Sequence, residues 1–217
     1  MRKKLIRFQE ITKRENIIEG DSIDPQDIKG KWNAVFFKND NPIVLELGCG
    51  RGEYSVGLAK EFPNKNFIGM DVKGDRIWFG STTAIENNLT NVGFLRGQIQ
   101  HLEQYFEEGE VSEIWITFPD PRPKVRDEKR RLTSPRFLNL YQKIVSPKGV
   151  IHLKTDNTPL YEYTLEVIKD FSTNLLANTD DLYKSSFDKD HLGIKTRFEK
   201  SYFEKGFNIK YLKFHFN

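Results

Sequence analysis

From Asn41 onward the chain alternates short apolar runs with longer segments of helical periodicity. Strand-sized apolar runs occupy 43–47, 66–71, 92–95, 113–118 and 150–154, and helical periodicity marks 53–62, 75–88, 99–106, 134–145 and 158–171. Such repeated alternation predicts an α/β fold, in which a mostly parallel sheet has helices on both faces. Residues 208–216 alternate polar and apolar positions, so we expect a half-exposed, antiparallel C-terminal strand.

Residues 1–40 lack such a pattern. They are polar and weakly periodic, and they carry basic residues at Arg2, Lys3, Lys4, Arg7, Lys13 and Arg14. A segment of this kind is usually a mobile or partly docked tail. The sequence therefore predicts a basic N-terminal leader over 1–40 and a single domain over 41–217.

Composition narrows the class of protein. The chain has 217 residues, of which 37% are apolar and 30% charged, and this suits one soluble domain with a buried core. No run could cross a membrane and the N-terminus does not resemble a secretory signal, so a cytoplasmic protein is expected. The one cysteine, Cys49, excludes an internal disulfide framework and a cysteine-based metal cluster. No metal site is expected, and monomer and homodimer both stay open.

Three glycines, Gly48, Gly50 and Gly52, follow the first predicted strand and precede a helix. At such a turn a ligand can approach the backbone closely. The spacing is Gly-x-Gly-x-Gly rather than that of the dinucleotide fingerprint, and Glu46 precedes it. A carboxylate there disfavours a pyrophosphate and favours a cationic sulfonium cofactor. Asp71, at the end of the next strand, is placed to bind ribose hydroxyls.

A glycine triplet alone often serves only as a tight turn. The ordered set of strand, Glu46, triplet, helix, strand and Asp71 is more specific. It predicts a pocket for S-adenosylmethionine, and the glycine spacing disfavours a nucleotide-dependent oxidoreductase.

The segment after Phe118 is the second informative feature. Prolines at 119, 121 and 123 stiffen the chain and hold Asp120 at the carboxyl end of a strand. A basic cluster follows, at Lys124, Arg126, Lys129, Arg130 and Arg131. Such a cluster beside a pocket suits a phosphodiester backbone. The alternative is a solvated charged loop, since Asp127 and Glu128 dilute the cluster.

This segment resembles the Pro-Asp-Pro-Trp-x-Lys-x-Arg-His-x-Lys-Arg-Arg signature of bacterial tRNA (guanine-N7)-methyltransferases. Lys154-Thr-Asp-Asn157 is similar to that family's Lys/Ala-Thr-Asp motif, and Thr196-Arg-Phe-Glu199 resembles its Thr-x-x-Glu motif. With 46–52 and Asp71, the resemblance covers roughly 41–217. It implies a Rossmann-like class I methyltransferase fold with a seven-stranded sheet.

The resemblance also implies a reaction and its participants. The chain would transfer a methyl group from S-adenosylmethionine to N7 of a guanine in the variable loop of tRNA, leaving S-adenosylhomocysteine. The implied cofactor contacts are Glu46, Gly48, Gly50, Gly52, Asp71, Gln98 and Asp120. The implied substrate contacts are Lys124, Asp156, Thr196, Arg197, Phe198 and Glu199, and the implied RNA contacts are Lys124, Arg126, Lys129, Arg130 and Arg131.

The chain departs from the family pattern at a few positions. Arg122 stands in place of a Trp, Asp127 in place of a His and Val125 in place of a common Lys, while Gln98 replaces an acidic residue or Asn. A Gln can still bond an adenine amino group. These departures bear on RNA contact more than on cofactor binding.

Asp120 is the expected catalytic residue. Guanine N7 has a free lone pair, so its methylation requires alignment and stabilisation of the developing positive charge more than proton removal. Asp120 and Asp156 are the expected electrostatic partners. Structural alternatives are a turn residue for Asp120, a helix N-cap for Asp156, and a capping box or surface pair for Thr196 and Glu199.

Two other functions stay open on the sequence alone. The chain could be a class I methyltransferase of another RNA or of a small molecule, because the glycine loop would be the same. It could also be a tRNA-binding protein that has lost catalysis, a reading that the retained Glu46, Asp71, Asp120 and Asp156 disfavour.

Overall fold

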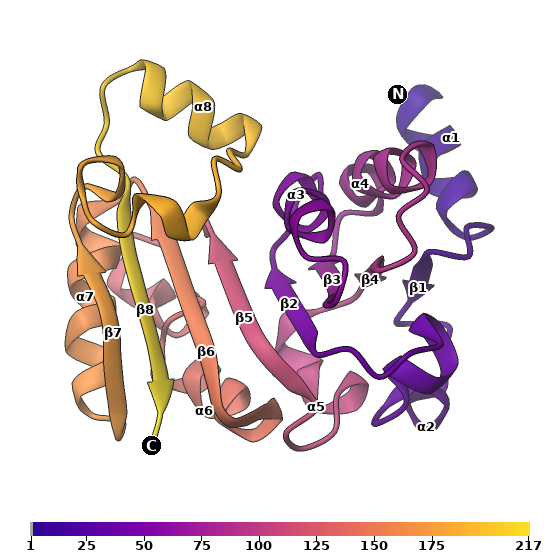
Figure 1. Ribbon diagram of the computed structural model, residues 1–217, viewed down its shortest axis with the longest axis horizontal. Helices are drawn as coiled ribbons and strands as arrows, with labels where there is room; N and C mark the ends of the chain where they lie inside the picture. Colours follow the sequence, from indigo (N-terminus) through magenta and orange to yellow (C-terminus); the bar gives the residue numbers. More distant parts are fainter. Residues whose placement is uncertain (1) are drawn as a thin grey trace.

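The computed structural model describes residues 2–217 and, within them, a sheet of eight strands in the order β1-β4-β3-β2-β5-β6-β8-β7 (Figure 1). Neighbours from β1 to β6 pair in parallel, while β8 pairs antiparallel with both β6 and β7. The bounds are β1 (Ile17–Glu19), β2 (Ile43–Leu47), β3 (Asn66–Asp71), β4 (Val92–Arg96), β5 (Val111–Thr117), β6 (Val145–Thr155), β7 (Thr173–Thr179) and β8 (Lys210–Phe216). The predicted α/β fold with an antiparallel C-terminal strand is confirmed.

Helices cover both faces of this sheet. The α-helices are α1 (Arg2–Ile11), α2 (Pro25–Ile28), α3 (Glu53–Glu61), α4 (Gly74–Glu86), α5 (Leu102–Tyr105), α6 (Pro135–Ile144), α7 (Thr158–Lys169) and α8 (Arg197–Glu204). Other helical turns, of 3-10 or π type, are η1 (Trp32–Phe37), η2 (Ile99–His101), η3 (Val125–Arg130), η4 (Leu182–Lys184) and η5 (Asp188–His191). Successive strand residues point to opposite faces, so the sheet separates two hydrophobic clusters.

The central strand β5 illustrates this division. Ile114 and Ile116 belong to the cluster that includes residues of α5, α6 and α7, whereas Trp115 belongs to the cluster that includes residues of α3 and α4. Both faces of the strand are therefore buried here, which explains why residues 114–116 are all apolar instead of alternating.

The N-terminal segment differs from its prediction as a leader. It contains α1, β1, α2 and η1, and β1 pairs in parallel with β4, so the sheet has eight strands rather than seven. Ile11 and Trp32 are fully buried, and the Trp32 indole N–H donates to the carbonyl of Tyr105 at 2.8 Å. These isolated anchors are too widely spaced to give a periodic pattern, so the sequence did not predict the elements of this segment.

Two later elements were also not predicted. Strand β7 has its exposed Leu175 and Leu176 side by side, which breaks the alternation expected of a strand. Helix α8 is short and has one fully buried residue, Glu199. Within α4, Ile77 and Ala84 are buried, whereas Ile85 is 54% exposed.

Candidate active site

Two cavities lie at the carboxyl ends of the parallel strands, the edge where α/β sheets bind ligands. One has a volume of about 530 Å³ and the other about 730 Å³, and both are lined by Gly48 and Arg76. The first is further lined by Cys49, Gly50, Arg51, Glu53, Thr117, Phe118, Thr196, Arg197, Phe198 and Ser201. The second is further lined by Asp71, Val72, Lys73, Gln98, Ile99, Gln100, Asp120, Arg122, Lys129, Arg130, Arg136 and Phe137.

The glycine loop forms the shared wall of these cavities. Gly48, Gly50 and Gly52 have φ values of 73°, 55° and 67°, a left-handed conformation that favours glycine. A Cβ on Gly50 would meet no atom within 4 Å, whereas a Cβ on Gly52 would lie 2.4 Å from the Phe94 ring. The loop therefore leaves open space above Gly50 and packs tightly at Gly52, where α3 begins.

Asp71 lies beside the loop at the end of β3. One carboxylate oxygen accepts from the Gly50 N–H at 3.0 Å, and the other accepts from the Lys73 N–H at 2.8 Å. The side chain is buried, yet it lines the second cavity together with the exposed Gln98. The structure thus brings the predicted ribose and adenine contacts to one cavity.

Glu46 is placed differently from the other predicted cofactor contacts. It is 3% exposed and is not among the residues that line the two cavities. Its carboxylate accepts from the Ser55 N–H at 2.9 Å, from the Ser55 hydroxyl and from the Thr117 hydroxyl at 2.8 Å. Burial raises the pKa of Glu46 to about 7, although these hydrogen bonds oppose the rise. Glu46 therefore ties the first turn of α3 to the end of β5.

The Pro-Asp-Pro segment leaves β5 through two residues with unusual backbones. Phe118 and Arg122 have φ values of 49° and 46°, which are uncommon for residues with side chains. The exposed Asp120 carboxylate accepts from the Arg122 N–H at 3.1 Å and pairs with the Arg122 guanidinium at 3.2 Å. Arg122, which replaces the family's Trp, thus partners the predicted catalytic residue directly.

The basic residues after Asp120 do not all line the same cavity. Lys129 and Arg130 line the second cavity, and Arg126 lines a neighbouring one with Lys129. Asp127 pairs with Arg130 at 3.2 Å. Lys124 is exposed and does not line these cavities, while the Arg131 guanidinium lies 4.2 Å from the Tyr163 ring.

Helix α8 brings part of the Thr-x-x-Glu motif to the first cavity. The Thr196 hydroxyl caps the helix by accepting from the Glu199 N–H at 3.1 Å, as in the alternative reading of this motif. The Phe198 ring lies 5.6 Å from that of Phe118, and the Arg197 N–H donates to Glu53 at 2.9 Å. Thr196, Arg197 and Phe198 all line the cavity.

The last motif residue, Glu199, points into the protein. Its carboxylate lies 2.8 Å from the Lys154 ammonium, and neither side chain is exposed. It also accepts from the Tyr183 hydroxyl. Asp156 is partly buried, its backbone carbonyl accepts from Lys210 at 3.3 Å, and it lines neither cavity. The N-cap of α7 is Asn157, not Asp156.

Several cavity residues were not identified from the sequence. Arg76 lines both cavities, and Arg51 and Glu53 line the first. Each is a charged residue within, or just before, a helix that follows a strand ending at these cavities. Such positions could be found by marking the first turn after each predicted strand, because parallel strands present those turns at one edge.

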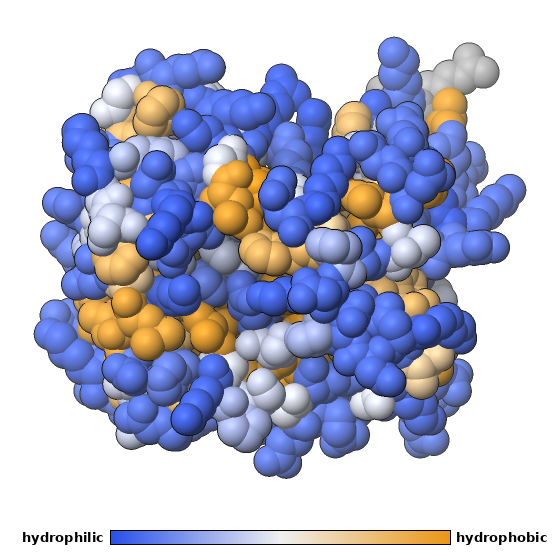
Figure 2. All heavy atoms as spheres, in the orientation of Figure 1, coloured by the Kyte–Doolittle hydropathy of each residue, from blue (hydrophilic) through white to orange (hydrophobic). Residues whose placement is uncertain are grey.

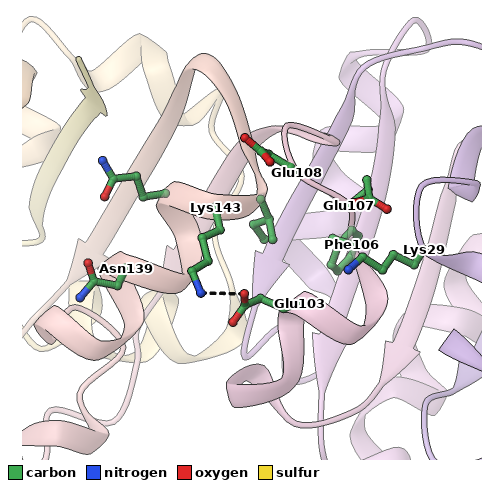
Figure 3. Close-up of a pocket in the computed structure, with 9 residues that line it drawn as sticks. Lys29, Glu103, Phe106, Glu107, Glu108, Asn139 and Lys143 are labelled. Carbon is green, nitrogen blue, oxygen red and sulfur yellow. Dashed lines mark hydrogen bonds and ion pairs between the residues drawn. The ribbon is translucent and has the colours of Figure 1, made fainter. Parts of the chain in front are cut away.

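A further cavity of about 780 Å³ lies at the opposite edge of the sheet (Figure 3). Phe106, Glu107 and Glu108 line it ahead of β5, and Lys143 pairs there with Glu103 at 2.8 Å. It is remote from the glycine loop. Among residues 2–217, no helix is long and apolar enough to cross a bilayer, and no cluster of three metal-ligating side chains occurs.

Solved structures with this architecture include several methyltransferases. The 16S rRNA methyltransferase KamB aligns with a TM-score of 0.65 at 14% identity, covering 84% of this chain and 91% of that chain. Geranyl diphosphate C-methyltransferase from Streptomyces coelicolor, solved with S-adenosyl-L-homocysteine, aligns with a TM-score of 0.53 at 14% identity, covering 80% and 68%. The fold is therefore that of the Rossmann-like methyltransferases.

Sequence comparison identifies the family within this class. Residues 40–212 match the family described as "Putative methyltransferase". The tRNA (guanine-N(7)-)-methyltransferase of Cytophaga hutchinsonii is 47% identical over 99% of this chain and 98% of its own length. That of Bacteroides fragilis is 50% identical over 88% and 75%, and that of Listeria monocytogenes is 38% identical over 89% of each chain. The chain belongs to the tRNA (guanine-N7)-methyltransferase family, as its motifs predicted.

Proposed function

We propose that this protein transfers a methyl group from S-adenosylmethionine to N7 of a guanine in the variable loop of tRNA. The observation that carries the proposal is the meeting of the glycine loop, Asp120 and the start of α8 around two cavities that share Gly48 and Arg76. Family membership and the match to relatives along nearly the full chain support the substrate class.

The residues present fit this cofactor. The space above Gly50 is open, so a ligand can approach the loop backbone closely. Asp71 presents a carboxylate to the second cavity and can exchange its bond with the Gly50 N–H for ribose hydroxyls. Gln98 lines the same cavity and can bond adenine. Gly48, Gly50, Gly52, Asp71 and Gln98 would hold the cofactor, and Glu46 would support them from beneath.

S-adenosylmethionine supplies a methyl group on a positively charged sulfur. In the transfer, the guanine N7 lone pair forms the new carbon–nitrogen bond as the carbon–sulfur bond breaks, and its electrons stay on sulfur. Positive charge therefore moves from sulfur to the purine ring. The protein must align the reacting atoms and stabilise the charge that develops on guanine.

Asp120 is the residue best placed for that stabilisation. Its carboxylate is exposed at the second cavity, close to the loop that both cavities share. It can accept from guanine N1–H and N2–H, which would orient N7 outward. Thr196, Arg197 and Phe198 would contact the substrate, and Phe198 offers an aromatic face to a base. Lys124, Asp156 and the basic residues 126–131 would contact the RNA around it.

The test is methyl transfer to a defined tRNA. The purified chain is incubated with tritium-labelled S-adenosylmethionine and unmodified tRNA transcript, and the labelled nucleoside is mapped by cleavage at N7-methylguanosine. Label in the variable-loop guanine, lost when that guanine is replaced by adenine, supports the proposal. Label elsewhere, or in another RNA, would indicate a different methyltransferase, and tRNA binding without transfer would indicate a binding protein.

A further inference from the structure

A second basic surface opens beside the first cavity. It is a groove of about 380 Å³ between α3, α4 and the start of α8, which we call the cationic groove. It is lined by Arg51, Gly52, Glu53, Val56, Gly57, Lys60, Phe79, Gly80, Thr83, Lys195, Arg197 and Lys200. Hydrophilic residues cover most of this upper edge of the molecule (Figure 2). None of its basic residues belongs to the signature after Asp120.

The groove carries a large excess of positive charge. Its lining includes five cations and one acid, Glu53, whose carboxylate already accepts from the Arg197 N–H at 2.9 Å. Across residues 2–217, no ion pair within 4.0 Å involves any of these cations: Arg51, Lys60, Lys195, Arg197 and Lys200. By contrast, Arg122 and Arg130 of the signature segment both have acidic partners.

Aromatic rings hold some of these cations in place. The Arg51 guanidinium lies 4.2 Å from the Phe79 ring centroid, and the Lys195 ammonium lies 4.3 Å and 3.9 Å from the rings of Tyr183 and Phe203. On the far side of the groove, Arg7 of α1 lies 4.4 Å from Phe79. Cation–π contacts fix the charges without neutralising them, so the groove is prepared for an anionic partner.

The groove is continuous with the first cavity, where Phe198 would contact the target base. Arg51, Glu53 and Arg197 line both spaces. A base in the first cavity would therefore place the adjoining sugar–phosphate chain at the mouth of the groove. Side-by-side cations without base-reading partners suit phosphates, which are recognised by charge and not by sequence.

We propose that the cationic groove binds the phosphodiester backbone of the tRNA next to the target guanine, and that α1 extends this surface through Arg7. The proposal rests on the proposed function for the identity of the RNA. It assigns backbone binding to α3 and α8, in addition to the segment after Asp120.

The test compares two double variants that each remove two positive charges. Lys60→Gln/Lys200→Gln alters exposed groove residues outside the first cavity, while Lys29→Gln/Lys148→Gln alters a half-buried and an exposed lysine at the opposite edge of the sheet. The affinity for unmodified tRNA is measured by fluorescence anisotropy across a series of salt concentrations. Affinity for S-adenosylhomocysteine, measured by calorimetry, should match the wild type in both.

We expect the groove variant to bind tRNA more weakly, with a salt dependence shallower by about 1.4–1.8 in log–log slope, because each lost phosphate contact removes about 0.7–0.9. The control variant should keep the wild-type slope. Equal slopes in the groove variant and the wild type would overturn the proposal, as would an equal loss in both variants. If the groove variant shows the expected weaker binding of tRNA but the wild type transfers no methyl group, only the proposed function fails.

Discussion

The ammonium of Lys154 and the carboxylate of Glu199 lie 2.8 Å apart, and both side chains are fully buried. Lys154 belongs to the Lys-Thr-Asp motif at the end of β6, and Glu199 to the Thr-x-x-Glu motif of α8. The ammonium also lies 4.8 Å from the Tyr54 ring. Two motifs that are separate in sequence are therefore joined by one ion pair, which fixes α8 against the sheet and places Phe198 at the cavity.

We predict that Lys154→Met lowers the free energy of unfolding by about 3–5 kcal/mol, because it leaves a buried carboxylate without its partner. Burial lowers the pKa of Lys154, while the neighbouring Glu199 carboxylate opposes this shift and favours the charged ammonium. Denaturant unfolding measures the effect. The additional change Glu199→Leu should recover much of the loss.

Lys169→Met is the matched control. This lysine pairs with Glu166 at 2.7 Å, but both side chains are exposed, so its loss should change stability little. If Lys154→Met and Lys169→Met unfolded at the same denaturant concentration, the buried pair would have no special importance for α8.

The sequence was most informative where a residue's position along a strand determines its role. Asp71 ends β3 and Asp120 follows β5, as the sequence led us to expect, and the parallel sheet brings both residues to the second cavity. The glycine spacing likewise predicted a turn that a ligand can approach closely, and in the structure these glycines have positive φ and the space above Gly50 is open. These features depend on local order along the chain.

Features that depend on contacts between residues far apart in the sequence could not be predicted. Nothing near Glu199 in the sequence indicates that its carboxylate meets Lys154, 45 positions away, instead of the cavity. Likewise, β1 has only three residues, and it is a strand because β4 offers it an edge. Short elements of this kind are specified by tertiary contacts rather than by periodicity.

We predict that Asp120→Asn slows methyl transfer by roughly 10²–10³-fold, because a neutral amide stabilises the developing positive charge poorly. Single-turnover transfer of tritium measures the rate, and calorimetry with S-adenosylhomocysteine checks that the pocket is intact. Asp127→Asn is the control, since Asp127 lies on the same segment, pairs with Arg130 and does not line the two site cavities. Full turnover in Asp120→Asn with normal cofactor affinity would exclude the catalytic role.

We predict that alanine at Gly50 and at Gly52 has different consequences. Both positions have positive φ, so each substitution costs about 1–2 kcal/mol in backbone strain. At Gly52 the new Cβ would also lie 2.4 Å from Phe94, which should destabilise the fold further. At Gly50 it would enter open space at the cavity, so Gly50→Ala should remain folded and bind S-adenosylhomocysteine weakly.

Unfolding by denaturant and calorimetric titration separate the two effects. Gly52→Ala should show the larger loss of stability, and Gly50→Ala the larger loss of affinity relative to its loss of stability. Normal cofactor affinity in Gly50→Ala would mean that the ligand does not approach the loop at this residue.

The buried Glu46 predicts a pH dependence of stability. Burial raises its pKa from 4.5 to about 7, so the folded state holds a proton that the unfolded state releases between these values. The stabilisation from this proton is complete below pH 4.5 and is lost as the pH rises to 7. A difference of this size corresponds to about 3 kcal/mol.

Glu46→Gln isolates this contribution, because a neutral amide can keep the bonds to Ser55 and Thr117 without titrating. We expect the free energy of unfolding of the wild type to fall relative to the variant as the pH rises from 5 to 8. Denaturant unfolding of both proteins at intervals across that range measures the difference. A constant difference would mean that Glu46 stays ionised in the folded protein, so that the anchor between α3 and β5 is a carboxylate throughout this range.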